Sequence, residues 1–226
     1  MEEAPSDASG HRARLRQRLF EGGGGALLDH ELVEYLLALA IPRRDTKAKA
    51  KALIARFGGI GPLLSADADT LRREGLSDGV IGALKIAEAS ALRMLETRID
   101  GRPILSSWDA LGDYLQAAMA NQAIEQVRVL FLNAKNMLIA NEAMWTGSLD
   151  DAFVHVREII ARAIALGATA IIIVHNHPSG DPTPSQADIR LTRDLIDAGR
   201  HMKIAVHDHV IVGAQGRSSL KAMGMI

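Results

Sequence analysis

Residues 168–178 read ATAIIIVHNHP, and this segment is the most informative one for the fold of the second half of the chain. The run 170–174 is short, continuous and rich in isoleucine, which is typical of a strand covered on both faces of a sheet. His175 and His177 follow at the carboxyl end of that strand. Residues two apart in extended backbone point to the same face, so both imidazoles can reach one ion.

Downstream of Pro178 the chain predicts a loop and then a helix. Residues 179–184 are rich in glycine and proline, and Ser185-x-x-Asp188 opens the helix. The loop can fold Asp188 back toward the two histidines. Two neutral imidazoles and one carboxylate leave the fourth tetrahedral position of zinc for water. We therefore predict that His175, His177 and Asp188 bind a catalytic zinc ion.

The same residues also admit a structural interpretation. Ser185 and Asp188 match a capping box, in which a serine and an acid three residues later satisfy free N–H groups of the first helical turn. Paired histidines near a strand end can likewise be ordinary polar residues of a turn. Each piece alone is typical of such a role, whereas their combination in this order favours a metal site.

The rest of the second half interleaves helices and strands. The predicted elements are strands at 127–131, 137–140 and 203–212 and helices at 152–166 and 185–198. This order predicts an α/β domain in which the elements surround one sheet.

The first half shows only helical spacing. Its apolar residues recur at helical intervals in segments 29–40, 45–57, 67–73 and 79–96, after a short basic helix that ends at the glycines 22–25. The predicted organisation is a disordered tail (1–10), an all-helical domain (11–98), a linker (99–107) and the α/β domain (108–226).

The amino-acid composition excludes several classes of protein and several kinds of metal site. Hydrophobic residues make up 48% of the chain and charged residues 23%, which indicates a globular protein. No stretch approaches the about 18 to 20 apolar residues of a membrane span, and no secretory signal is apparent, so we expect a cytoplasmic protein without a membrane partner. The absence of cysteine excludes disulfides and thiolate ligands, so a metal must be held by His, Asp or Glu.

Positive charge is concentrated in one segment, although the net charge is only -1. Residues 11–56 contain ten Lys and Arg residues against five Asp and Glu residues. This basic stripe is either a solvated helix face or a surface for weak DNA binding.

The sequence His175-Asn176-His177-Pro178 through Ser185-x-x-Asp188 resembles the JAMM motif of the JAB/MPN metalloproteases, and the chain is more narrowly similar to RadC proteins. The RadC resemblance continues at Gly10-His11-Arg12, Arg44-Asp45, Gly147, Asp208-His209 and Ser219-Leu220. It implies a JAMM/MPN (cytidine-deaminase-like) mixed sheet with flanking helices, preceded by a helix-hairpin-helix-like domain. The chain departs from the family pattern at Val156, where proline is frequent, and at His207, where leucine is frequent.

The resemblance also implies the roles of the catalytic residues. Ser185 would help to bind the oxyanion, and an upstream glutamate would activate the water. We choose Glu125, because it opens the strand expected beside the metal strand, and keep Glu142 as the alternative. Without the resemblance, a lone glutamate at a strand start is typical of a solvated strand end.

Two other histidine patterns favour ordinary structure. The segment His30-Glu31-Leu32-Val33-Glu34 begins like a metalloprotease helix motif, but Glu34 stands where the second histidine would be. The triplet His207-Asp208-His209 alternates on a predicted strand and lacks an obvious third ligand or loop.

These patterns lead to one functional expectation and one alternative. We expect a zinc-dependent metallohydrolase, peptidase-like, whose helical domain docks a partner or a peptide or protein substrate. The alternative, which the resemblance to RadC proteins implies, is a DNA-repair-associated protein that binds nucleic acid and uses zinc on phosphoesters or for structure. The hairpin Gly75-Leu76-Ser77-Asp78-Gly79 is a degraded version of the pattern that grips phosphates and contains an acid, so direct phosphate binding stays open.

Overall fold

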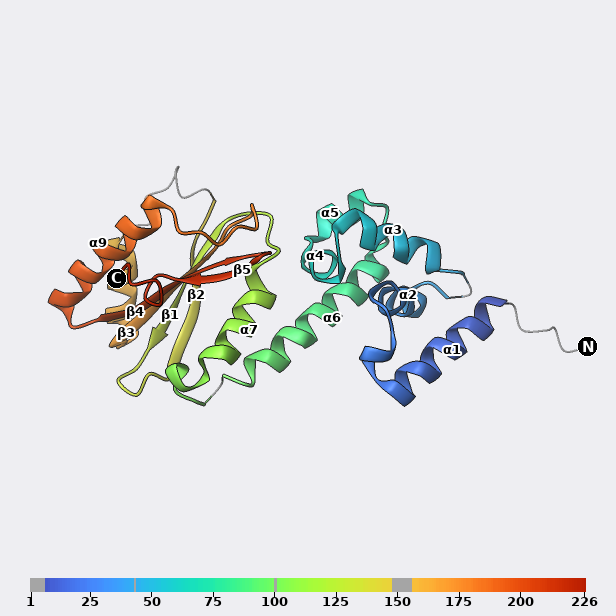
Figure 1. Ribbon diagram of the computed structural model, residues 1–226, viewed down its shortest axis with the longest axis horizontal. Coiled ribbons are helices and arrows are strands. Elements are labelled where there is room, and N and C mark those ends of the chain that lie inside the picture. The colour runs from blue at the N-terminus through green and yellow to red at the C-terminus, as the bar shows by residue number, and fades with distance from the viewer. Residues whose placement is uncertain (1–6, 43, 100, 148–155) are drawn as a thin grey trace, which may run out of the picture. The chain divides into compact units, whose positions relative to one another are not determined.

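The computed structural model describes residues 7–42, 44–99, 101–147 and 156–226 (Figure 1). The chain divides into two compact units, Met1–Ala91 and Leu92–Ile226. In these described ranges, no helix is both long enough and apolar enough to cross a membrane.

The first unit is helical throughout its described part. Its elements are α1 (Asp7–Gly22), the 3₁₀ turn η1 (Gly24–Ala26), α2 (Asp29–Ala40), α3 (Lys47–Phe57), α4 (Ile60–Ser65), α5 (Ala68–Arg73) and most of α6 (Asp78–Glu96). Residues 7–10 belong to α1 rather than to the tail predicted for 1–10, and residues 1–6 lie outside the described residues. Helix α4 was not predicted, because Gly61 and Pro62 resemble a turn. Pro62 stands in its first turn, where a missing N–H breaks no helical hydrogen bond.

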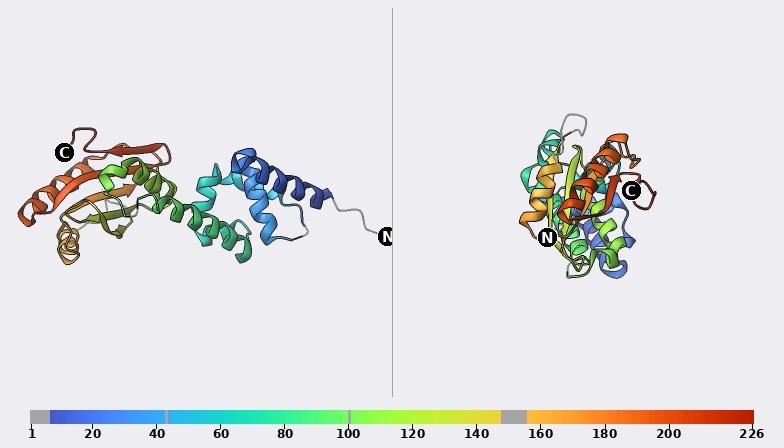
Figure 2. Two further views of the ribbon diagram at one scale, coloured as in Figure 1. Left: turned by 90° about the horizontal axis from the view of Figure 1, so that it is seen from below. Right: turned by 90° about the vertical axis from the view of Figure 1, so that its left-hand side faces the viewer.

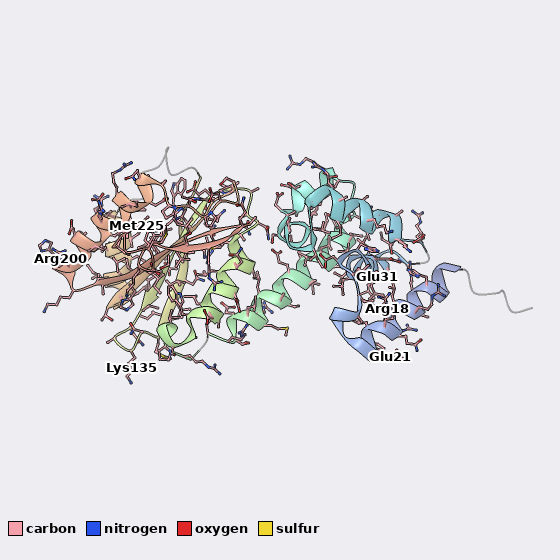
Figure 3. All side chains as sticks on the ribbon, in the orientation of Figure 1. Arg18, Glu21, Glu31, Lys135, Arg200 and Met225 are labelled. Atoms are coloured by element: carbon pink, nitrogen blue, oxygen red, sulfur yellow. The ribbon has the colours of Figure 1, made fainter. Side chains whose placement is uncertain are left out.

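Apolar side chains from these helices form one core, in which Leu37, Leu63, Leu71 and Leu84 are fully buried. The segment from His30 to Glu34 has structural roles around this core. Glu31 accepts two hydrogen bonds from Arg18, at 2.7 and 2.9 Å, and both residues are labelled in Figure 3. Glu34 is buried and its Oε1 lies 2.9 Å from Nε2 of His11.

The second unit contains all the strands that the structure describes. Its elements are η2 (Ile104–Ser107), α7 (Trp108–Met119), β1 (Gln126–Leu132), β2 (Leu138–Thr146), α8 (Val156–Ala165), β3 (Ala170–Asn176), α9 (Gln186–Met202), β4 (Ala205–Gly213) and β5 (Gly216–Ser219). Residues 152–155 of the predicted helix 152–166 lie outside the described residues. Within the segment 99–107, which the sequence predicts as a linker, Ile99 and Ile104 belong to the core of this unit.

The five strands form one mixed sheet in the order β2-β1-β3-β4-β5. Strands β3 and β4 are parallel, and the other neighbouring pairs are antiparallel. Every residue of the central strand β3 is buried, which explains its continuous apolar run. The predicted mixed sheet with flanking helices, after a helical region, is therefore confirmed.

Helices cover both faces of this sheet (Figures 1 and 2). Helix α7 packs against a core that includes Leu130, Ile172 and Val210, whereas α8 and α9 pack against a core that includes Phe131 and Ile173. Alternate residues of a strand face opposite sides, so His175 shares the side of Ile173. The end of β3 thus directs His175 toward α9.

Candidate metal centre

Two histidine rings meet at the carboxyl end of β3. Nε2 of His175 lies 2.9 Å from Nε2 of His177, with His175 fully buried and His177 partly exposed. The two-residue spacing places both rings on one side of the sheet, as the extended backbone predicts. On the other side of its ring, His177 Nδ1 lies 2.7 Å from the carbonyl oxygen of Asp181.

Asp188 joins the histidines from the first turn of α9. Its Oδ1 lies 3.3 Å from His175 Nε2, and its Oδ2 lies 3.8 Å from His177 Nε2. The capping box is also present, because Ser185 N donates to Asp188 Oδ2 and Asp188 N donates to Ser185 Oγ. The structural and the metal interpretations of Ser185-x-x-Asp188 are therefore compatible, since one carboxylate oxygen caps the helix while the other faces His175.

Glu125 approaches the same point from the residue before β1. Glu125, His175 and His177 each offer a ligand atom, and these atoms lie within 4.8 Å of one another. The sheet explains this proximity, because Val127 pairs with His175 across the antiparallel strands β1 and β3. Glu125 is half-buried, whereas Asp188 is fully buried.

Asn176 holds the backbone on both sides of Glu125. Its side-chain Oδ1 accepts from Gln126 N at 2.9 Å, and its Nδ2 donates to the carbonyl oxygens of Ile124 and Gln122 at 3.2 and 3.4 Å. Asn176 is fully buried, so these bonds are shielded from water. The residue between the two histidines thus fixes the segment that carries Glu125.

Glu142, the alternative acid, is engaged elsewhere. It lies on β2 opposite Val129, and its carboxylate accepts two hydrogen bonds from Arg162 of α8 at 2.6 and 2.8 Å. This bonding lowers the pKa of Glu142, which makes it a weaker proton acceptor. Within the described part of the chain, the structure brings Glu125, and not Glu142, into the cluster with His175 and His177.

The donor set suits a cation. His177 Nδ1 faces a carbonyl oxygen, which can only accept, so the proton of a neutral His177 lies on Nδ1 and the lone pair lies on Nε2. Asp188 Oδ1 is buried and has no hydrogen-bond partner among the described residues. Burial lowers the pKa of His175 to about 4, so its ring is neutral near pH 7. The Nε2 lone pair of His177 and Asp188 Oδ1 both accept and face His175 Nε2, so a cation bound between these atoms would give each acceptor a partner.

His209 was missed by sequence reasoning, which gave the triplet 207–209 a structural role. Its Nε2 lies 2.8 Å from Nδ1 of His175, because His209 pairs with Ile173 in the parallel strands β4 and β3. His207 instead contacts Asn136 Oδ1, and Asp208 accepts from the backbone of Lys221. The sequence shows the alternation of residues 207–209 on a strand, but it does not show that this strand, β4, pairs with β3.

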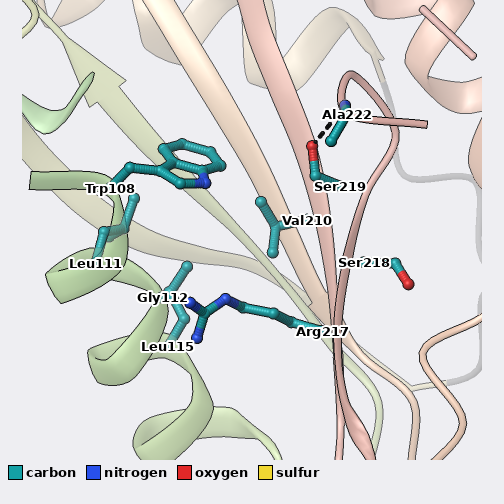
Figure 4. A pocket seen from close by; sticks show the side chains of 9 residues that line it. All are labelled: Trp108, Leu111, Gly112, Leu115, Val210, Arg217, Ser218, Ser219 and Ala222. Carbon is teal, nitrogen blue, oxygen red and sulfur yellow. Dashed lines mark hydrogen bonds between the residues drawn. The ribbon is translucent and has the colours of Figure 1, made fainter. Parts of the chain in front are cut away.

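A separate cavity of about 190 Å³ lies on the opposite face of the sheet, between α7 and strands β4 and β5 (Figure 4). Trp108, Leu111 and Leu115 of α7 line it together with Arg217 of β5. The guanidinium of Arg217 extends along Gly112, where a Cβ atom would lie 2.2 Å from its Cζ. None of the predicted catalytic or metal-binding residues lines this cavity.

The second unit is similar to a known protein family. The family model described as the RadC-like JAB domain matches residues 105–225, which span the whole sheet and the cluster at the end of β3.

Proposed function

Because this chain belongs to the family of RadC-like JAB domain proteins, we propose that it is a zinc-dependent hydrolase of amide or isopeptide bonds. JAB domains are generally hydrolytic metalloenzymes, and the His and Glu cluster could hold a metal. The observation that carries the proposal is that Glu125 and Asp188 each bring a carboxylate oxygen close to the rings of His175 and His177.

We assign the metal to His175, His177 and Asp188, and proton transfer to Glu125. Both carboxylates are near the histidines, so the assignment rests on their surroundings. Asp188 is fully buried, with one oxygen 3.3 Å from His175 Nε2 and without a described hydrogen-bond partner. Glu125 is half-buried at a strand end, where water and substrate can reach it. A ligand suits the enclosed position and a base suits the accessible one.

The chain's own residues divide the remaining work. Bound zinc would supply a Lewis acid that makes water more acidic. The Glu125 carboxylate would take the proton from that water and later give it to the leaving amine. Asn176 holds the backbone around Glu125 in place while the proton moves. The exposed Ser185 hydroxyl would donate to the oxygen of the attacked carbonyl as negative charge develops.

The test uses one zinc-loaded preparation of the full chain. It would be incubated with a peptide library, with isopeptide-linked substrates, and with single- and double-stranded DNA. We expect cleavage of amide or isopeptide bonds that stops when a chelator removes the zinc. Cleavage of DNA alone would overturn the proposal in favour of phosphoester chemistry, and tightly bound zinc without any hydrolysis would favour a structural role.

We further propose that the helical unit binds DNA only weakly. Several cations of the basic stripe are already used within the unit: Arg18 binds Glu31, Arg56 binds Glu74, and Lys49 donates to the Gly75 carbonyl. A cavity of about 440 Å³ beside the stripe is lined by His11, Arg12, Arg14 and Lys47, but also by the acids Glu34 and Asp45. This mixture of charges is less favourable to phosphate than a purely basic groove.

A further inference from the structure

A line of hydrogen-bonding groups leads from the backbone of α9 to His175. The hydroxyl of Thr192 lies 2.6 Å from the carbonyl oxygen of Asp188 and 2.6 Å from His209 Nδ1. His209 Nε2 lies 2.8 Å from His175 Nδ1. Thr192, His209 and His175 are all fully buried. The line therefore connects two of the proposed metal ligands through groups that water does not reach.

The chemistry of the groups fixes the direction of every hydrogen bond. The Asp188 carbonyl can only accept, so the Thr192 hydroxyl donates its one proton to it. Thr192 Oγ1 must then accept from His209, which places a proton on His209 Nδ1. His209 is fully buried, and its two ring nitrogens face a hydroxyl and a second imidazole rather than a carboxylate, so the proton on Nδ1 leaves the lone pair on Nε2. That lone pair accepts from His175 Nδ1–H.

The consequence falls on the other nitrogen of His175. A neutral ring with its proton on Nδ1 has its lone pair on Nε2. This is the nitrogen that faces His177 Nε2 at 2.9 Å and Asp188 Oδ1 at 3.3 Å. We propose that Thr192 and His209 are positioning residues that hold His175 in the tautomer able to bind the metal. The inference rests on the proposed function of the site as a metal centre.

A purely structural role of Thr192 would require only its volume and not its hydroxyl group. An apolar side chain could fill the space of Thr192, but the proton on His209 Nδ1 would then have lost its hydroxyl acceptor. His209 Nδ1–H would keep only the Asp188 carbonyl as an acceptor, so the proton would shift toward Nε2, which would donate to His175 Nδ1. The proton of His175 would move to Nε2, the atom needed as a ligand. Partners of this kind typically change metal affinity about 10- to 100-fold.

The test compares Thr192→Val, which keeps the shape and removes the hydroxyl, with Thr192→Ser, which restores it. Zinc affinity is measured by competition with a chelator, and the ring-nitrogen NMR shifts of His175 are recorded in metal-free protein. We expect Thr192→Val to weaken zinc about 10- to 100-fold and to move protonation of His175 from Nδ1 toward Nε2. Thr192→Ser should return both measurements to the wild-type values.

Two outcomes would overturn the inference. One is zinc affinity of Thr192→Val within twofold of wild type, together with unchanged His175 nitrogen shifts. The other is a wild-type protein in which His175 carries its proton on Nε2. Should Thr192→Val fail to fold, the wild-type NMR spectrum still decides between the tautomers. If wild-type protein binds no zinc, the proposed function fails, whereas the metal-free spectrum continues to test the role of Thr192 and His209 separately.

Discussion

At the residue scale, local spacing predicts which side chains of the site lie together when they are close in the sequence. The two histidines alternate on a strand, and Ser185 and Asp188 follow a helix start, so their local geometry is set by neighbouring residues. The connections of Thr192 and His209 depend on helix α9 lying over strand β4. The function of Asn176 depends on strand β1 lying beside β3. Such pairings between distant segments leave no local signature in a single sequence.

Glu125 and Asp188 should respond differently to removal of their charge. Glu125→Gln should keep the fold and the zinc but lower hydrolysis about 10²- to 10⁴-fold, because an amide cannot accept the proton from water. Asp188→Asn should lose zinc and activity together. Zinc content and turnover would be measured on the same samples.

Glu142→Gln is the matched control, because Glu142 lies at the same sheet but pairs with Arg162. Its activity should remain near that of wild type. If Glu142→Gln abolishes hydrolysis while Glu125→Gln preserves it, the wrong acid has been assigned.

The metal-free protein should lose stability as the solution becomes acidic. Burial lowers the pKa of His175 to about 4, below the about 6.5 of an exposed histidine in the unfolded chain. Between these values the unfolded state binds more protons, so the free energy of unfolding should fall by up to roughly 1.4 kcal/mol per pH unit from this group. Urea unfolding at pH 7.5 and pH 5 measures the effect. If the free energy of unfolding changes equally with pH in His175→Gln, another group is responsible for the effect.

At the element scale, the spacing of apolar residues predicts the longer helices and strands. It does not predict elements that are very short or that contain glycine and proline. The buried run of β3 and the helices α2, α3 and α6 lie close to their predicted positions. Strand β5 has four residues, which is too short for a clear alternation, and α4 is obscured by glycine and proline. Helix α7 has a clear apolar face but adjoins a segment whose Gly101 and Pro103 resemble a linker. The sequence therefore predicted the central layer better than the elements at its edges.

Two helical glycines should tolerate alanine very differently. At Gly199 of α9, a Cβ atom would lie 2.4 Å from the carbonyl oxygen of Ile204, which is backbone that cannot easily move. Gly199→Ala should cost about 1 to 3 kcal/mol of stability through overpacking. At Gly112 the obstructing atoms belong to the flexible end of Arg217, and alanine gains about 1 kcal/mol in helix propensity. Gly112→Ala should therefore be nearly neutral.

Urea or thermal unfolding of the two variants side by side measures the difference. Equal stability of Gly199→Ala and Gly112→Ala would contradict the close approach of α9 to the start of β4.

At the scale of the whole molecule, the change from helical to mixed periodicity correctly predicted a helical region followed by an α/β region. The predicted boundary at 99–107 stays a prediction, although Ile99 and Ile104 pack into the α/β core. The family match covers residues 105–225 and thus the hydrolase-like part. Charge counts could not reveal which arginines of the helical unit are already paired, because those pairings are formed by the fold.

DNA binding by the full chain should be weak and strongly dependent on salt. Within the described ranges of the basic stripe, five cationic side chains donate no hydrogen bond and form no ion pair: Arg14, Arg16, Arg44, Lys47 and Lys51. If these contact phosphates, the plot of log affinity against log salt should have a slope no steeper than about −4.5. Fluorescence anisotropy with labelled duplex DNA measures this slope.

Charge reversal identifies the surface. Arg14→Glu with Lys47→Glu should reduce DNA binding, while Arg193→Glu with Arg200→Glu, two exposed positions of α9, should not. Binding that persists at high salt, or that is lost only in the α9 variant, would contradict a weak site on the helical unit.

The end of β3 is proposed to hold one catalytic metal ion, and zinc analysis of the purified chain is the direct test. We expect about one zinc per wild-type chain, because one set of histidine and carboxylate ligands lies there. The double variant His175→Ala with His177→Ala should remain folded and contain no zinc. Full retention of zinc by that folded variant would contradict the assignment of the metal centre.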